Sequence, residues 1–146
     1  MKMTLLPALF LGWALLLSNH AEARMITVNS ADEYTKHYQG DVPLITMYSA
    51  EWCGPCKQMK PHFYAAAEAV SDIIFCVIDT EAKAFSKILS DIRSIPTTIL
   101  SYKGKQINRT SGGLTRTQID ASINELRSKT QQEQPKATQP IAPQKK

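Results

Sequence analysis

The chain has 146 residues, of which 43% are hydrophobic and 21% charged, and this balance is typical of a globular protein with one domain. The formal net charge of +4 is too small and too evenly spread to indicate nucleic-acid binding, so we expect no nucleic acid among its partners. Composition excludes collagen-like and wholly disordered chains, and the three cysteines are too few for a scaffold built on disulfides.

The first 23 residues have the order of a secretory signal. Lys2 is followed by an apolar run from Leu5 to Leu17 and by the triplet Ala21-Glu22-Ala23, after which we expect cleavage. As a helix, this run of 13 residues would span about 20 Å, short of the roughly 30 Å of a bilayer's hydrocarbon core. We therefore expect an exported protein, periplasmic in a Gram-negative bacterium and otherwise secreted. The alternative is a membrane anchor, if the signal is not cleaved.

Residues 24–129 are predicted to form the folded domain, because strand-length apolar runs alternate with segments of helical apolar spacing. In chain order they predict a strand at Met25–Val28, a helix from Ser30 to about Gly40, a strand at Val42–Ser49, a helix from Cys56 to about Val70, a strand at Ile73–Ile78, a helix at Glu81–Leu89, a strand at Thr97–Tyr102, its hairpin partner at Gln106–Thr110 and a last helix that starts at Thr115. This order predicts an α/β fold with a mixed sheet and helices on both faces.

Residues 130–146 are predicted to be a disordered tail rich in Gln, Pro and Lys. Ile141 is the single large aliphatic residue there, so the segment cannot bury enough apolar surface to offset the entropy of ordering. A solvated extension is the simplest interpretation. The alternatives are a Pro-rich ligand and a weak basic contact with anionic surfaces.

Two cysteines, Cys53 and Cys56, fall at the junction between a predicted buried strand and the helix that follows it. At a helix start, the unpaired backbone amides and the positive end of the helix dipole stabilise the thiolate of Cys53. Pro55 fits there because it needs no donor, and Cys56 lies one turn further in, more shielded but within reach of a disulfide. Cys53 would then attack a substrate disulfide, and Cys56 would release the reduced substrate and leave a Cys53–Cys56 bridge.

Two other uses of this cysteine pair remain open. Zinc would need further ligands, and the candidates Cys76, His37 and His62 do not stand at paired ligand spacing. A purely structural disulfide is disfavoured because so short a loop contributes little closure entropy. We therefore expect a redox-active disulfide, with no metal and no cofactor.

The segment Ala50-Glu51-Trp52-Cys53-Gly54-Pro55-Cys56-Lys57 resembles the active site of thioredoxins. Further matches follow in the family's order and approximate spacing: Pro61, Ser94-Ile95-Pro96-Thr97, Lys103-Gly104 and Gly112-Gly113. The resemblance covers nearly all of residues 25–129 and implies a thioredoxin fold and a thiol-disulfide oxidoreductase acting on protein disulfides.

The resemblance also assigns roles beyond the two cysteines. It implies that Trp52, Gly54 and Pro55 belong to the active-site turn. Pro96 should be a cis-proline that faces the cysteines, and the backbone of Ile95 should pair with a bound peptide as a short strand. The apolar rim on which a substrate docks would consist of Trp52, Ile95, Pro96 and Gly113.

Three residues depart from the family's pattern. Thioredoxins usually carry a buried aspartate six residues before the first cysteine and commonly a lysine on the next strand, and these positions align with Met47 and Phe75. Without a buried acid, release of the mixed disulfide by Cys56 should be slower or have a different pH dependence; drift within a well-packed core is the alternative. Ser49 stands where a tryptophan is common and should open space beside the cysteines.

For three other side chains, Cys76, Lys57 and Lys60, the sequence predicts less specific roles. Cys76 is expected to behave as a small buried hydrophobe. Lys57 and Lys60 should lie on a solvated helix face, where their charge would also favour the Cys53 thiolate.

The direction of electron flow follows from the same resemblance. Cys-Gly-Pro-Cys with Ile95 before Pro96 resembles reducing thioredoxins, at about −270 mV, more than oxidising periplasmic proteins near −120 mV. An exported reductant needs regeneration, so we expect a membrane electron donor as a partner, and we expect a monomer. The alternatives are an oxidase or isomerase with the same cysteines, and a thioredoxin-fold binding module whose redox turnover is incidental.

Overall fold

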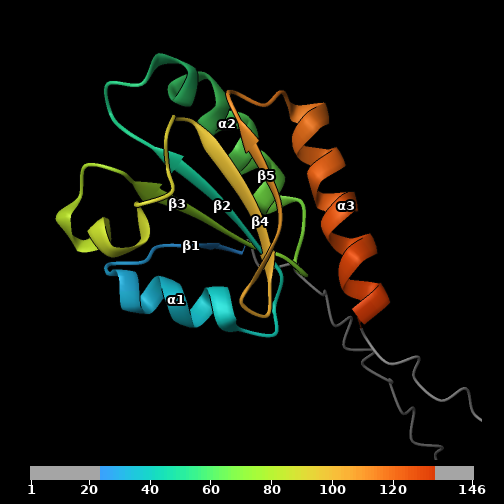
Figure 1. The fold of residues 1–146 in the computed structure, drawn as a ribbon. Coiled ribbons are helices and arrows are strands. Elements are labelled where there is room, and N and C mark those ends of the chain that lie inside the picture. Colours follow the sequence, from blue (N-terminus) through green and yellow to red (C-terminus); the bar gives the residue numbers. More distant parts are fainter. Residues whose placement is uncertain (1–23, 134–146) are drawn as a thin grey trace, which may run out of the picture.

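The computed structural model describes residues 24–133 (Figure 1). The predicted signal at 1–23 and residues 134–146 of the predicted tail lie outside the described residues. The helices and strands are, in chain order, β1 (Met25–Ile26), α1 (Ala31–Gln39), β2 (Leu44–Ser49), α2 (Gly54–Glu68), β3 (Ile74–Asp79), the 3-10 helix η1 (Lys83–Ile88), β4 (Thr97–Tyr102), β5 (Lys105–Ser111) and α3 (Arg116–Glu133).

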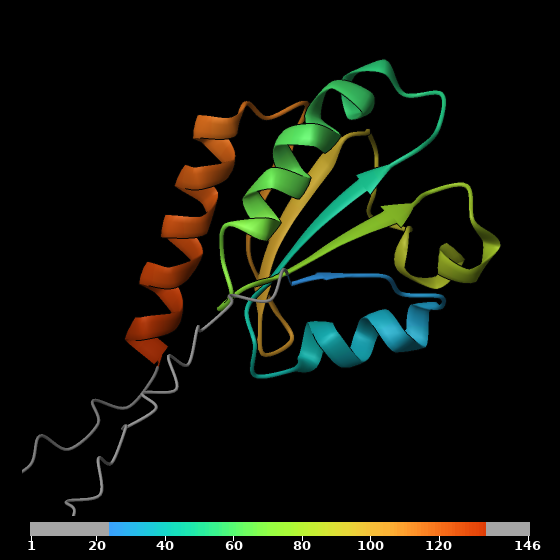
Figure 2. The same ribbon diagram turned by 180° about the vertical axis from the view of Figure 1, so that it is seen from behind.

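The strands form one mixed sheet in the order β1-β3-β2-β4-β5. β3 runs parallel to β1 and β2, whereas β4 is antiparallel to both β2 and β5. Helices α2 and α3 cover one face of the sheet, and α1 and η1 cover the other (Figures 1 and 2). The predicted mixed sheet with helices on both faces is confirmed.

The central strand β2 is buried along its whole length and separates two hydrophobic cores. Ile45 and Met47 face the core under α2 and α3, whereas Leu44 and Tyr48 face the core under α1 and η1. This alternation follows from the two-residue period of a strand, and apolar residues on both faces are expected for a strand covered on both sides. The segment that follows β2 therefore starts from a fixed position at the C-terminal end of this central strand.

The spacings of Ser30 to Glu33 and of Thr115 to Gln118 predict capping boxes at two helix starts, and both are confirmed. The backbone N–H of Glu33 donates to Ser30 Oγ at 3.2 Å before α1. At the start of α3, the N–H of Gln118 donates to Thr115 Oγ1 at 3.3 Å, and the N–H of Thr115 donates to Gln118 Oε1 at 2.8 Å. These contacts satisfy amides that have no partner inside the helix.

Two predictions on helix extent are wrong. The helix expected at Glu81–Leu89 is the six-residue 3-10 helix η1, which lacks a side-chain cap and buries Phe85 while Ala84 stays exposed. Such short connections often adopt the tighter 3-10 geometry. Residues 130–133, predicted to belong to a disordered tail, are instead part of α3, which continues to Glu133; Thr130 is buried, and its hydroxyl donates to Arg127 O at 3.0 Å.

Candidate active site

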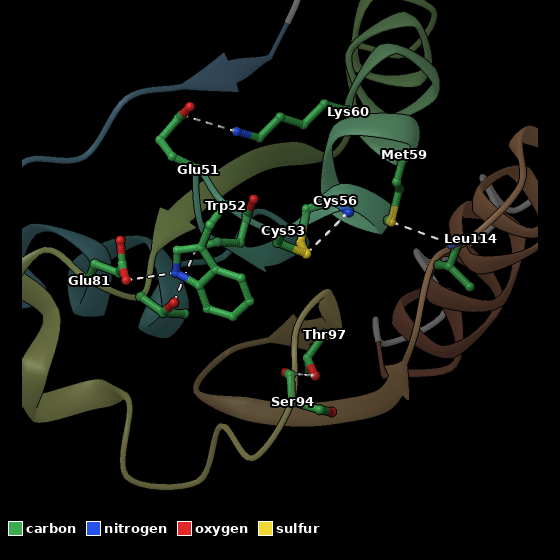
Figure 3. Close-up of a disulfide and its surroundings, with 12 residues drawn as sticks. Glu51, Trp52, Cys53, Cys56, Met59, Lys60, Glu81, Ser94, Thr97 and Leu114 are labelled. Atoms are coloured by element: carbon green, nitrogen blue, oxygen red, sulfur yellow. Dashed lines mark hydrogen bonds and ion pairs between the residues drawn. A yellow bond between two sulfur atoms is a disulfide. The ribbon is translucent and has the colours of Figure 1, made fainter.

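A disulfide joins Cys53 and Cys56 at the start of α2, with their Cα atoms 5.3 Å apart (Figure 3). Cys53 is the N-cap residue of the helix, and its Sγ accepts a hydrogen bond from the N–H of Cys56 at 3.3 Å. Pro55 occupies the first turn, where a missing N–H leaves no bond unmade. Cys53 is 4% exposed and Cys56 is fully buried, which is the order of accessibility that attack followed by resolution requires.

The electrostatics of this helix start favour a thiolate on Cys53 after reduction. No acidic residue stands in the first turn of α2, so the partial positive charge of the helix end is not offset from within the helix. Lys57 is exposed on the same turn. Lys60, half-buried, forms an ion pair with Glu51, Nζ to Oε1 at 3.8 Å, rather than lying fully in solvent.

Trp52 lies beside the cysteines as an exposed side chain, 68% accessible. Its indole Nε1 donates to Glu81 Oε1 at 2.7 Å (Figure 3). The backbone N–H of Glu81 in turn donates to Asp79 Oδ1 at 2.9 Å. Glu81 follows β3, the parallel neighbour of β2, so both segments emerge at the same sheet edge. Sequence reasoning missed Glu81 as a site residue; its place three residues after the predicted strand Ile73–Ile78 was the available signal.

The loop before β4 brings Ile95 and Pro96 to the site, and the peptide bond between them is cis. Thr97 Oγ1 donates to Ser94 O at 2.8 Å, which ties the loop to the first residue of β4. The N–H of Gly112 donates to Pro96 O at 2.8 Å. Gly112 has a φ of +99°, a conformation that glycine adopts without strain, so the chain can turn here toward Gly113.

Two surface cavities flank the cysteine turn. The first, of about 350 Å³, is lined by Trp52, Thr80, Leu89, Ile92, Arg93, Ser94 and Ile95. The second, of about 210 Å³, lies between Pro55 and Gly113 and also contacts His62. The structure thus gathers the predicted site residues from three separate segments around one disulfide, and their roles in substrate docking stay predictions.

Buried apolar residues occupy the two positions where the family's pattern has a charged pair. Met47 and Phe75 are both fully buried in the cluster that contains Cys56. A hydrogen bond from the N–H of Leu114 to Met59 Sδ, 3.4 Å long, joins two residues of the same cluster, a contact that sequence reasoning did not anticipate. Ser49, on the same sheet face as Met47, is buried and its hydroxyl has no partner within residues 24–133.

Cys76 lies on the opposite face of the sheet, fully buried in the core under α1. Burial raises the pKa of its thiol to about 12, with a smaller contribution from the charge of Glu33. The expectation of a buried hydrophobe agrees with this placement, and the side chain is remote in the fold from the disulfide.

We expect Cys76 to resist alkylation while the protein is folded. After mild reduction at pH 8, iodoacetamide should label Cys53 first, because a thiol with a pKa near 12 carries little thiolate at that pH. Mass spectrometry of digested protein checks this, and labelling in denaturant serves as the control. Rapid labelling of Cys76 under native conditions would contradict the buried placement.

Residues 24–133 contain no group of three or more His, Cys, Asp and Glu side chains arranged to hold a metal ion. Within the same residues, no helix is long and apolar enough to cross a bilayer.

A cysteine pair at a strand-to-helix junction, closed as a disulfide and facing a cis-proline loop, defines a redox-active dithiol protein. The thioredoxin family profile matches residues 25–125. Thioredoxin from rabbit (Oryctolagus cuniculus) is 30% identical over 103 residues, covering 70% of this chain and 97% of its own. The chain therefore belongs to the thioredoxin family, whose members are thiol-disulfide oxidoreductases.

Other relatives agree with this assignment. Thioredoxin C-3 from Corynebacterium nephridii is 43% identical over 74 residues, and the match spans about half of each chain, 51% in both cases. Among solved structures, thioredoxin from Trypanosoma brucei brucei superposes with a TM-score of 0.63 at 19% identity, covering 77% of this chain and 97% of its own. Thioredoxin NaTrxh from Nicotiana alata gives 0.62 at 26% identity, covering 70% and 92%. The thioredoxin fold is thus confirmed.

Proposed function

We propose that this protein is exported and reduces protein disulfides, forming a mixed disulfide on Cys53 that Cys56 resolves. The observation that carries the proposal is the position of Cys53: it caps α2, and its sulfur already accepts the N–H of Cys56 at 3.3 Å. The same amide would stabilise the Cys53 thiolate that attacks a substrate and, later, leaves from it.

The substrate is proposed to be an extended peptide segment around a disulfide. The cavities on either side of the cysteine turn would take side chains next to the reacting sulfur, one against Trp52 and Ile95 and the other against Pro55 and Gly113. The backbone of Ile95, next to the cis bond, would pair with the peptide as a short strand. Docking there would hold the substrate sulfur over Cys53.

Export and regeneration complete the proposal. The charged start, short apolar run and Ala21-Glu22-Ala23 triplet support secretion, to the periplasm in a Gram-negative bacterium, with a membrane anchor if the signal is retained. Exported compartments are kept oxidising, so a reductant working there as a monomer requires a membrane protein that returns electrons to the Cys53–Cys56 disulfide.

Mixed-disulfide trapping tests the proposed reaction. In the Cys56→Ser variant, attack by Cys53 cannot be resolved, so substrate proteins should stay bound through a bond that dithiothreitol releases. The Cys53→Ser, Cys56→Ser double variant is the matched control and should trap nothing. Equal recovery on both variants, or full biological activity of the double variant, would instead favour a binding module.

A measured reduction potential decides the direction of electron flow. We expect a value near that of reducing thioredoxins, about −270 mV, by equilibration with a glutathione buffer. A value near −120 mV would overturn the proposed reductase and favour an oxidase or isomerase that uses the same cysteines.

A further inference from the structure

Ser49 carries a buried hydroxyl that no protein atom among residues 24–133 satisfies. The residue is 1% exposed and ends β2, where its carbonyl oxygen accepts from the N–H and the hydroxyl of Thr80 at 2.9 and 3.3 Å. The backbone at the strand end is therefore held in place, and the hydroxyl is buried there. A buried polar group without a partner costs about 1–3 kcal/mol, and proteins commonly satisfy such groups with ordered water.

The structure provides room for that water. A small cavity of about 40 Å³ lies at the ends of β2 and β3, and Ser49 lines it together with charged residues. The lining residues are Ser49, Ala50, Glu51, Lys60, Val77 and Asp79. One water needs about 10–15 Å³ and two to four polar partners, and this cavity supplies both.

Lys60, on the active-site helix α2, supplies the positive charge at this cavity. Its side chain is 24% exposed and runs toward Glu51, which is 82% exposed (Figure 3). Lys60 stands four residues after Cys56 in α2, so the two side chains share one helix face, with Cβ atoms about 5–6 Å apart. Lys57, one residue after Cys56, does not share that face.

A thiolate on Cys56 has no stabilising charge within its own core cluster. Cys56 is fully buried there, and its neighbours in the cluster are apolar, including Met47 on β2 and Phe75 on β3. Leu100 of β4 and Ile119 of α3 add no charge either. Burial among apolar groups disfavours a thiolate relative to the thiol, yet the thiolate is the form that attacks a mixed disulfide.

We propose that the cavity binds one water between Ser49 Oγ and Lys60 Nζ, and that Lys60, held there one helical turn from Cys56, stabilises the Cys56 thiolate. The inference rests on the proposed role of Cys56 as the resolving thiol. Lys60 acts on Cys56 through its positive charge alone and does not transfer a proton. The carboxylates that also face the cavity, Glu51 and Asp79, oppose the effect, but both residues are exposed and therefore more strongly screened.

In the resolving step, the Cys56 thiol loses its proton to solvent, and the thiolate attacks Cys53 Sγ of the mixed disulfide. The Cys53–Cys56 bond forms while the bond between Cys53 and the substrate sulfur breaks. The substrate leaves as a thiolate, which takes up a proton from solvent.

Titration of Cys56 in a Cys53→Ser background tests the inference, using the cysteine ¹³Cβ chemical shift as the readout. Adding Lys60→Met should raise the titration midpoint by about one pH unit, because a nearby opposite charge is lost. Lys60→Arg should restore the original midpoint. Ser49→Ala should raise it in the same direction, since the water loses its anchor.

Lys57→Met is the matched control, because it removes the same charge from the exposed helix position next to Cys56. Equal shifts for Lys57→Met and Lys60→Met, or no shift for Lys60→Met, would overturn the inference. In the protein with both cysteines, the pH profile of mixed-disulfide release should move to higher pH with Lys60→Met. The titration needs no substrate, so a failure of trapping with Cys56→Ser would sink the proposed function and leave this result standing.

Discussion

Replacing Cys53 with serine is expected to lower the reduction of a disulfide-bonded test protein by at least about a thousand-fold. Cys53 supplies the sulfur that caps α2 and accepts the N–H of Cys56, and a serine hydroxyl in its place is not ionised at neutral pH. Stopped-flow or turbidity assays of disulfide reduction with a chemical electron donor measure the loss. Far-UV circular dichroism should be unchanged, because the helix keeps a serine, a favourable N-cap residue.

Cys76→Ala is the matched control for the loss of a cysteine. Cys76 is buried on the other face of the sheet, so its removal should leave the rate of reduction within about two-fold of the original while lowering stability modestly, as expected when a small buried side chain is truncated. Full activity of Cys53→Ser, or a comparable loss with Cys76→Ala, would show that the redox chemistry does not reside in the Cys53–Cys56 pair.

Met47→Asp is expected to destabilise the fold by about 2–4 kcal/mol at neutral pH. The side chain of Met47 is fully buried in the same apolar cluster as Phe75, so a carboxyl there would have no cation to pair with. Burial holds that carboxyl protonated in the folded state, whereas the unfolded chain ionises near pH 3.9. The folded state then binds more protons, so stability should fall as the pH rises above about 4. Urea unfolding at pH 5 and pH 8 measures this slope.

Met47→Asn separates charge from polarity, because it buries a polar group of the same shape that does not titrate. Its stability should be low at both pH values without the added slope. The same pair of variants tests the chemistry: an acid near Cys56 should speed mixed-disulfide release and alter its pH profile, whereas the amide should not. An unchanged rate and profile in Met47→Asp would refute the idea that the apolar pair Met47 and Phe75 slows resolution.

Much of the site could be predicted because it is local in the chain. Cys53, Pro55 and Cys56 sit within one helical turn, and the apolar run of β2 before them fixes where that turn begins. The substitution of Met47 for an acid was visible for the same reason, since it lies at a fixed offset on the same strand. By contrast, the Glu81 contact to Trp52 spans 29 residues and depends on how two loops leave the sheet edge.

The amino-acid sequence alone predicts the order of strands and helices, both capping boxes, the cysteine junction and the apolar replacement of the buried pair. It could do so because hydrogen bonding within an element and burial of one face depend on residues a few positions apart. Long-range packing is what brings Ile95, Gly113 and Glu81 around one disulfide, turns Lys60 toward Glu51, and leaves the Ser49 hydroxyl buried without a partner among residues 24–133. These contacts join segments far apart in the chain, and their geometry is set by strand order and by the packing of side chains from several elements at once.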